Sequence, residues 1–187
     1  MMEIKKKNVI IISIIFFMML FKNANSSDYE KVFYDFSIKD INGKLINLNK
    51  FKKKAILLVN VASYCGFTKQ YKDMQNLWEN YKHKNLVVLG VPSNTFKQEK
   101  KTNEEVKNFC EVNFNITFPI TSIYEVKGIN AHEIYKWAEK NYGRSAIPKW
   151  NFHKILINKE GKIEDTFSSF TNPSSKKIIS KIENILN

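Results

Sequence analysis

The sequence predicts an α/β fold with a central mixed sheet flanked by helices. Two apolar runs, 55–62 and 86–91, have the length of strands and no alternation of polar residues, which is typical of strands buried on both faces. Segments with apolar residues at helical spacing follow both runs. Because strands and helices alternate along the first half of the chain, we expect one sheet with helices packed on its faces.

The first half of the predicted domain begins with a hairpin. Asn42-Gly43, a strong hairpin signal, separates the short apolar segments 36–38 and 45–48. After the first buried strand, a helix is predicted from about Thr68 to Tyr81, because apolar residues recur at helical spacing: Tyr71, Met74, Leu77, Trp78 and Tyr81. Pro92 ends the second buried strand.

The second half is predicted to contain two helices around an extended segment. Thr102 and Glu105 fit a capping box that opens a helix running to about Phe114, and one face of this helix is expected to carry Val106, Phe109, Cys110 and Asn113. An extended segment begins at 118–120. The next helix covers 130–141 and turns three residues inward: Ile134, Trp137 and Ala138.

A second hairpin and a helix close the chain. The apolar segments 155–157 and 163–167 surround Lys159-Glu160-Gly161, which predicts a turn. An amphipathic helix after Pro173 places four apolar residues on one side: Ile178, Ile182, Ile185 and Leu186. This order of elements is the one that a thioredoxin-like α/β sandwich requires.

The net charge of the chain is +12 at pH 7, and lysines scattered along the sequence carry it. Such dispersion is typical of a solvated surface; the alternative is weak attraction to anionic membrane lipid or to an acidic protein partner. The chain has no Arg-rich run and no basic motif interleaved with aromatic residues, so no nucleic acid is expected as a partner.

The first 26 residues have the pattern of a signal peptide. Lys5, Lys6 and Lys7 precede an apolar run, 9–21, that is shorter than the roughly 20 residues needed to cross a bilayer. We expect a signal peptide or an uncleaved signal anchor at 1–26 and one domain at 27–187. The expected location is the secretory pathway or an organelle reached through it, and the alternative is cytosolic.

Two cysteines and three histidines are the candidates for reactive or metal-binding chemistry. The histidines lie far apart without ligand spacing, so we expect neither a metal site nor a cofactor. Cys65 follows a buried strand and precedes Gly66 and a helix, whose first N–H groups favour a reactive thiolate. From local sequence alone, an inert buried cysteine is an equal alternative.

Three blocks, in order, resemble the glutathione peroxidase family. Residues 60–68 (NVASYCGFT) match its first motif, with cysteine where some members carry selenocysteine, and 91–99 and 150–152 match its second and third. The resemblance implies a catalytic tetrad of Cys65, Gln98, Trp150 and Asn151. It also implies a peroxidase that reduces hydrogen peroxide and organic or lipid hydroperoxides.

The residue types of the implied tetrad suit this chemistry. Indole and amide N–H groups are neutral donors that stabilise a thiolate and a departing alkoxide without forming a tight ion pair. The alternatives are a core Trp150, a loop Asn151 and a surface Gln98.

Cys110 stands in a segment that resembles the resolving-cysteine region of the non-selenium, thioredoxin-dependent branch of this family. A sulfenic acid on Cys65 would condense with it to a disulfide. Because a disulfide needs Cα atoms roughly 4.4–6.8 Å apart, we expect the helix around Cys110 to unwind during turnover. A packed, inert helix cysteine is the alternative.

The branch also implies a reductant and an oligomeric state. The segment 120–149 is too short for the loop that builds tetramers in glutathione-using relatives, so the resemblance implies a monomer recycled by thioredoxin or a thioredoxin-like protein. Reduced thioredoxin is scarce in the oxidising secretory route, which conflicts with the predicted location. The alternatives are a redox relay or peroxide sensor, a glutathione-dependent peroxidase, a thiol-disulfide exchange protein and an inactive binding module.

Overall fold

The structure, a computed structural model, describes residues 29–187, and one compact unit spans residues 31–187. The predicted signal segment, 1–26, lies outside the described residues, so its boundary with the domain 27–187 stays a prediction. Within the described part of the chain, no helix is long and apolar enough to span a membrane.

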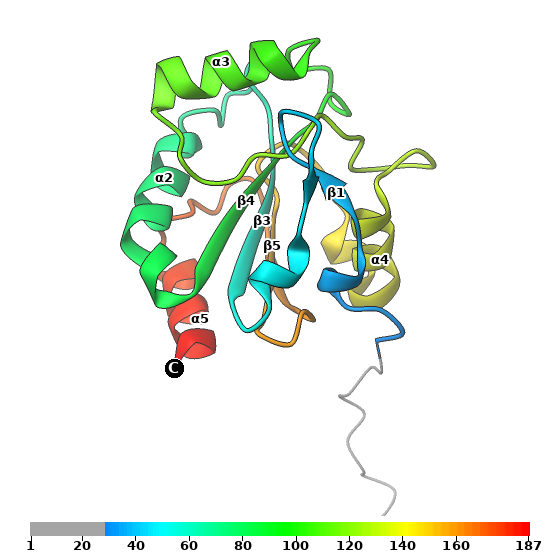
Figure 1. Ribbon diagram of the computed structural model, residues 1–187, viewed down its shortest axis with the longest axis vertical. Helices are drawn as coiled ribbons and strands as arrows, with labels where there is room; N and C mark the ends of the chain where they lie inside the picture. Colours follow the sequence, from blue (N-terminus) through cyan, green and yellow to red (C-terminus); the bar gives the residue numbers. More distant parts are fainter. Residues whose placement is uncertain (1–28) are drawn as a thin grey trace, which may run out of the picture. The chain divides into compact units, whose positions relative to one another are not determined.

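A four-stranded mixed sheet forms the centre of this unit (Figure 1). β3 (Ala55–Val61) and β4 (Leu86–Pro92) run parallel, and all their residues are buried, as the unbroken apolar runs predict. β5 (Lys154–Ile157) pairs antiparallel with the other side of β3, and β6 (Ile163–Phe167) pairs antiparallel with β5. The order β4-β3-β5-β6 confirms the predicted mixed sheet.

Four α-helices accompany the sheet in the described residues: α2 (Gln70–Tyr81), α3 (Asn103–Phe114), α4 (Glu133–Tyr142) and α5 (Lys176–Leu186). Figure 1 shows α2 and α5 on one side of the sheet, α4 on the other and α3 across one end. All four predicted helices are confirmed. α4 begins later than predicted, because Gly128 to Ala131 form a turn and the His132 side chain caps the helix by accepting from the Ile134 N–H.

Both predicted hairpins are present. β1 (Ile38–Lys39) pairs with β2 (Leu45–Ile46) across a turn in which Gly43 has φ +81°. The β5–β6 turn contains Gly161 with φ +79°. Short 3-10 helices complete the secondary structure: η1 (Phe33–Asp35), η2 (Leu48–Phe51), η3 (Lys82–Lys84) and η4 (Gly143–Ala146).

Burial varies along the face of α3 that was predicted to carry Val106, Phe109, Cys110 and Asn113. Val106 and Cys110 are buried, but Phe109 is only partly buried and Asn113 is exposed. The amide of Asn113 donates to the Phe109 carbonyl of its own helix at 2.8 Å, and the residue lines an open cavity at the end of α3. Residues on one helix face can differ in burial, because helical spacing gives the direction of a side chain and not whether another element covers it.

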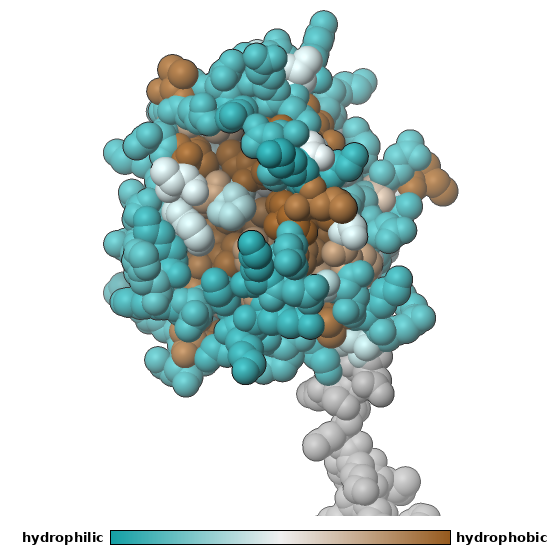
Figure 2. Space-filling view, in the orientation of Figure 1, coloured by the Kyte–Doolittle hydropathy of each residue, from teal (hydrophilic) through white to brown (hydrophobic). Residues whose placement is uncertain are grey.

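The surface in view is mostly hydrophilic, as expected for a chain with lysines scattered along its sequence. Hydrophilic residues cover most of the face in Figure 2, and hydrophobic residues gather near its centre.

Candidate active site

Cys65 lies in the loop between β3 and α2. It is 7% exposed, and its Sγ accepts a hydrogen bond from the backbone N–H of Phe67 at 3.4 Å. Thr68 closes the loop, because its hydroxyl accepts from the Cys65 N–H at 3.0 Å and donates to the Ala62 carbonyl at 2.9 Å. This N–H group points at the sulfur atom that is the candidate nucleophile.

The start of α2 is not directly beside the sulfur. Turns closed by the N–H groups of Thr68 and Gln70 lead from Cys65 into the helix, which begins at Gln70. The nearest donor to the sulfur is therefore the Phe67 N–H in this turn. Lys69 and Lys72, which follow in sequence, line the cavity at the end of α3.

Gln98 and Asn151 meet although they are far apart in sequence. The Asn151 Nδ2 donates to the Gln98 Oε1 at 3.0 Å, and the Gln98 carbonyl accepts from the Tyr64 N–H at 2.9 Å. Gln98 thus joins the loop of Cys65 to the loop of Asn151. Because it uses its side-chain oxygen in this bond, its amide N–H groups are the donors it can offer to sulfur or to peroxide oxygen.

Asn60, inside β3, fixes the loop that carries the third motif. Its Nδ2 donates to the Trp150 carbonyl and its Oδ1 accepts from the His153 N–H, both at 3.1 Å. Phe152 adopts a left-handed conformation with φ 62°, and its N–H donates to the Asn60 carbonyl at 2.6 Å. The sequence reasoning assigned no role to Asn60, although a polar residue in an otherwise apolar strand is a usable signal.

The exposure of the predicted tetrad residues excludes one of the alternatives, a core Trp150. Trp150 is 42% exposed, and its ring packs against Phe96 with centroids 5.2 Å apart, so it is not a core tryptophan. Asn151 is fully buried in the loop before β5, so the alternative of a loop residue stays open. Gln98 is partly buried.

Cys110 is buried in α3 and is 1% exposed. Burial raises the pKa of its thiol to about 12, while the nearby Tyr71 side chain acts in the opposite direction. Both cysteines are free thiols that belong to the same hydrophobic cluster. In this folded form Cys110 is a protonated thiol and a poor nucleophile.

A family model described as glutathione peroxidase matches residues 33–139, more than half of the chain. The chain belongs to the glutathione peroxidase family. Glutathione peroxidase-like peroxiredoxin 2 of Saccharomyces cerevisiae is 43% identical over 148 residues, which cover 76% of this chain and 91% of the relative. Hydroperoxy fatty acid reductase gpx1 of Synechocystis is 38% identical over 162 residues, which cover 82% of this chain and 95% of the relative.

Solved structures agree with this membership. The crystal structure of Trgpx in its apo form superposes with a TM-score of 0.67 at 34% identity, covering 83% of this chain and 96% of that one. A thioredoxin-family thiol:disulfide interchange protein of Chlorobium tepidum shares the fold, with a TM-score of 0.60 at 17% identity over 81% of this chain and 93% of that one. This glutathione peroxidase therefore has the predicted thioredoxin fold and is a thiol peroxidase.

Lys154 is a buried residue of this peroxidase that the sequence reasoning missed. Its Nζ donates to the Gln70 Oε1 at 2.6 Å and to the Thr171 carbonyl at 2.7 Å, and burial lowers its pKa to about 7. The Gln70 amide in turn donates to the Ser169 carbonyl at 2.7 Å. Lys154 thereby ties the start of α2, just after the Cys65 loop, to the segment that follows β6. The available signal was a charged residue directly before the apolar residues 155–157.

A cavity of about 310 Å³ lies beside Trp150. Its apolar lining comes from Trp150, Ile147 and Phe170, and its polar lining includes His153 and Lys149. Phe170 also packs edge-on against Phe67, the residue whose N–H contacts the Cys65 sulfur, with centroids 5.2 Å apart. The cavity therefore shares Trp150 with the candidate site, and Phe170 joins its lining to the Cys65 loop.

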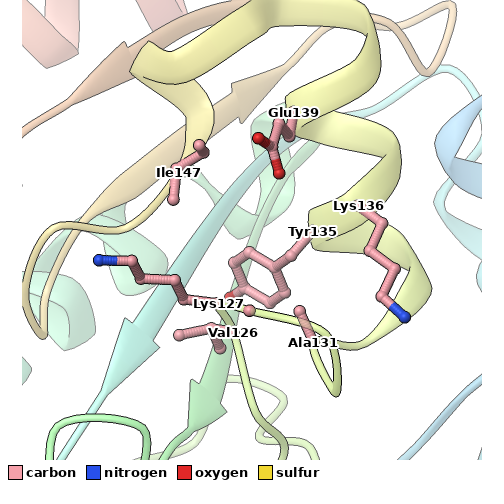
Figure 3. A pocket seen from close by; sticks show the side chains of 8 residues that line it. Val126, Lys127, Ala131, Tyr135, Lys136, Glu139 and Ile147 are labelled. Carbon is pink, nitrogen blue, oxygen red and sulfur yellow. The ribbon is translucent and has the colours of Figure 1, made fainter.

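A second cavity, of about 220 Å³, lies against α4 (Figure 3). The Tyr135 ring points into it, and the buried Tyr135 hydroxyl has no hydrogen-bond partner among residues 29–187. None of the five predicted site residues lines this cavity, although Ile147 lines both this cavity and the one beside Trp150. Among residues 29–187, no three His, Cys, Asp or Glu side chains are grouped as metal ligands would be.

Proposed function

We propose that this peroxidase works by a two-cysteine cycle in which Cys65 reacts with the hydroperoxide and Cys110 resolves the product. The observation that carries the proposal is the Phe67 N–H directed at the Cys65 sulfur, in a loop bonded to the Gln98–Asn151 pair. The contacts between this loop and the Gln98–Asn151 pair support the proposal, because these segments carry the sequence motifs of the implied tetrad.

The first step oxidises Cys65. Its thiolate attacks the terminal oxygen of the hydroperoxide, the O–O bond breaks, and the alkoxide leaves and takes up a proton to become an alcohol. Donors on Gln98, Asn151 and Trp150 stabilise the charge that moves from sulfur to oxygen. Cys65 is left as a sulfenic acid.

The second step forms the disulfide. The Cys110 thiolate attacks the Cys65 sulfur, the S–O bond breaks and water leaves. Because burial both covers Cys110 and raises the pKa of its thiol to about 12, α3 has to open before this step. A Cys65–Cys110 disulfide formed at full yield with no change in α3 would contradict this expectation.

Thioredoxin is the reductant that we propose for the disulfide. Its dithiol transfers two electrons by thiol-disulfide exchange and restores both cysteines. The proposal is supported by the peroxiredoxin names of the relatives and by a short 120–149 segment, which holds only α4 and η4. The same short segment supports a monomer, which a sedimentation experiment tests.

Stopped-flow measurement of peroxide reduction by wild type, Cys65→Ser and Cys110→Ser tests the cycle. The Cys65→Ser variant is expected to lose peroxide reduction, because no other described residue takes the place of the sulfur. The Cys110→Ser variant is expected to react once with peroxide and then stop, since its sulfenic acid has no partner thiol. Turnover by wild type with glutathione as fast as with thioredoxin would overturn the proposed reductant.

Organic hydroperoxides are the substrate class that the site favours. The cavity beside Trp150 offers apolar surface for an alkyl or acyl group, and the basic protein surface attracts an anionic lipid surface. One relative is named a hydroperoxy fatty acid reductase. Equal rate constants for hydrogen peroxide and a phospholipid hydroperoxide would remove this assignment, and co-sedimentation with anionic vesicles tests the lipid contact.

We propose the secretory pathway, or an organelle reached through it, as the location. The support is the basic start and short apolar run within residues 1–26. A thioredoxin-like protein of that compartment, such as a protein disulfide isomerase, would then supply electrons. Uniform cytosolic fluorescence of a C-terminal fluorescent fusion would refute this location.

A further inference from the structure

One lysine lies between the residues that precede the two cysteines. The Lys100 Nζ is 4.6 Å from the ring centroid of Tyr64 and 5.7 Å from that of Phe109. Tyr64 directly precedes Cys65, and Phe109 directly precedes Cys110 in α3. An ammonium within about 6 Å of an aromatic face is attracted by the ring, so Lys100 bridges the Cys65 loop and α3.

The backbone around Lys100 is also attached to both segments. The Glu99 Oε1 accepts from the Ser63 N–H at 3.0 Å and from the Lys100 N–H at 2.8 Å, which ties Lys100 to the start of the Cys65 loop. On the other side, the Thr102 N–H donates to the Glu105 Oε2 at 3.0 Å in the capping box of α3. Lys100 therefore lies at the joint between the loop and the helix.

The groups around Lys100 stabilise its charged form. The Tyr64 side chain, followed by Glu105 and Glu99, raises the pKa of the ammonium above its ordinary value. The group is thus a cation throughout the neutral range and contributes to both ring contacts.

We propose that Lys100 is a positioning residue that holds α3 closed on the Cys65 loop and thereby limits how often Cys110 reaches oxidised Cys65. The inference rests on the proposed two-cysteine cycle. In that cycle the disulfide forms only from the open state of α3, so its rate is proportional to the population of that state. Removing the ring contacts of Lys100 raises this population.

The expected change follows from the strength of exposed cation–π contacts. Loss of two such contacts raises the rate constant of disulfide formation about tenfold. The sulfenic acid of Cys65 then lasts for a shorter time, so less of the enzyme is overoxidised to sulfinic acid at high peroxide. A contact that only supported the fold would not produce both effects together.

Stopped-flow tryptophan fluorescence with hydrogen peroxide tests the proposal on the full domain. It separates a first phase that depends on peroxide concentration from a second phase that does not. In Lys100→Gln the second phase is expected to be about tenfold faster, and mass spectrometry is expected to find less sulfinic acid than in wild type. Lys100→Arg, which keeps the cation, should restore the wild-type rate, and Lys101→Gln serves as the neighbouring control.

Three kinds of result would contradict either the role of Lys100 or the two-cysteine cycle. A second phase in Lys100→Gln that stays within about twofold of wild type, or becomes slower, overturns the role of Lys100. Equal acceleration in Lys101→Gln would assign the effect to net charge and would also overturn it. If wild type shows no peroxide-independent phase, or if Cys110→Ser retains one, the two-cysteine cycle fails instead.

Discussion

The hydrogen bonds and burial of single residues in this peroxidase depend on partners that are distant in sequence. Asn151 is buried because Gln98 accepts its amide hydrogen, and the loop around it keeps its shape through Asn60. The motifs predicted which residues are candidates for the site, but not these bonds. The sequence likewise did not predict the burial of His153, which it showed only as an isolated histidine.

His153 is expected to make folding sensitive to acid. Burial, assisted by Lys154 and Lys149, lowers its pKa from 6.5 to about 4, and its Nε2 has no hydrogen-bond partner in the described part of the chain. Between pH 6.5 and pH 4 the unfolded chain binds a proton that the folded chain does not, so the free energy of unfolding falls as pH falls through this window. The contribution lost is about 2 kcal/mol between pH 6.5 and 4.5.

Urea unfolding at both pH values measures this loss. His153→Gln should lose about 2 kcal/mol less than wild type, and the exposed His83→Gln should behave as wild type does. Parallel losses in all three proteins would show that other groups cause the acid sensitivity.

At the scale of secondary structure elements, local sequence predicted where elements lie better than what they contact. Asn42-Gly43 and Lys159-Glu160-Gly161 both predicted hairpins, and both are present. The two turn glycines nevertheless differ, because a Cβ on Gly43 would meet nothing within 4 Å, whereas one on Gly161 would lie 2.7 Å from the Tyr34 ring. Only packing between η1 and the second hairpin creates this difference.

The two glycines provide a matched pair of substitutions. Gly43→Ala is expected to cost about 1 kcal/mol of unfolding free energy, because alanine is strained at positive φ. Gly161→Ala should cost about 3 kcal/mol, since overpacking against Tyr34 adds to the same strain. Urea unfolding of both variants gives the comparison, and equal costs would show that the Tyr34 ring moves aside freely.

At the scale of the whole molecule, the site is assembled from segments along the full length of the domain. The loop after β3, the segment after β4, the loop before β5 and the segment after β6 all contribute. The cavity beside Trp150 is also lined by segments that are distant in sequence, because Ile147 precedes β5 and Phe170 follows β6. Its proposed role is to receive the organic group of a hydroperoxide.

Phe170→Ala tests that role. Phe170 is 85% exposed, so its loss should spare the fold while removing apolar surface from the cavity. The ratio of the rate constant for cumene hydroperoxide to that for hydrogen peroxide is expected to fall about fivefold, the effect of roughly 1 kcal/mol of lost apolar contact. Val112→Ala, which changes a side chain that is 84% exposed on α3, is the matched control. An unchanged ratio in Phe170→Ala, or the same fall in Val112→Ala, would contradict the assignment.

The sequence by itself determined the order of strands and helices, both hairpins, the thioredoxin-like fold and the set of candidate residues, because periodicity, turn residues and short motifs are local properties. Tertiary structure alone decided that Asn113 is exposed, that Lys154 is buried among carbonyl groups and that Lys100 lies between Tyr64 and Phe109. Burial and contact depend on which distant segment covers a side chain. No short stretch of sequence contains that information.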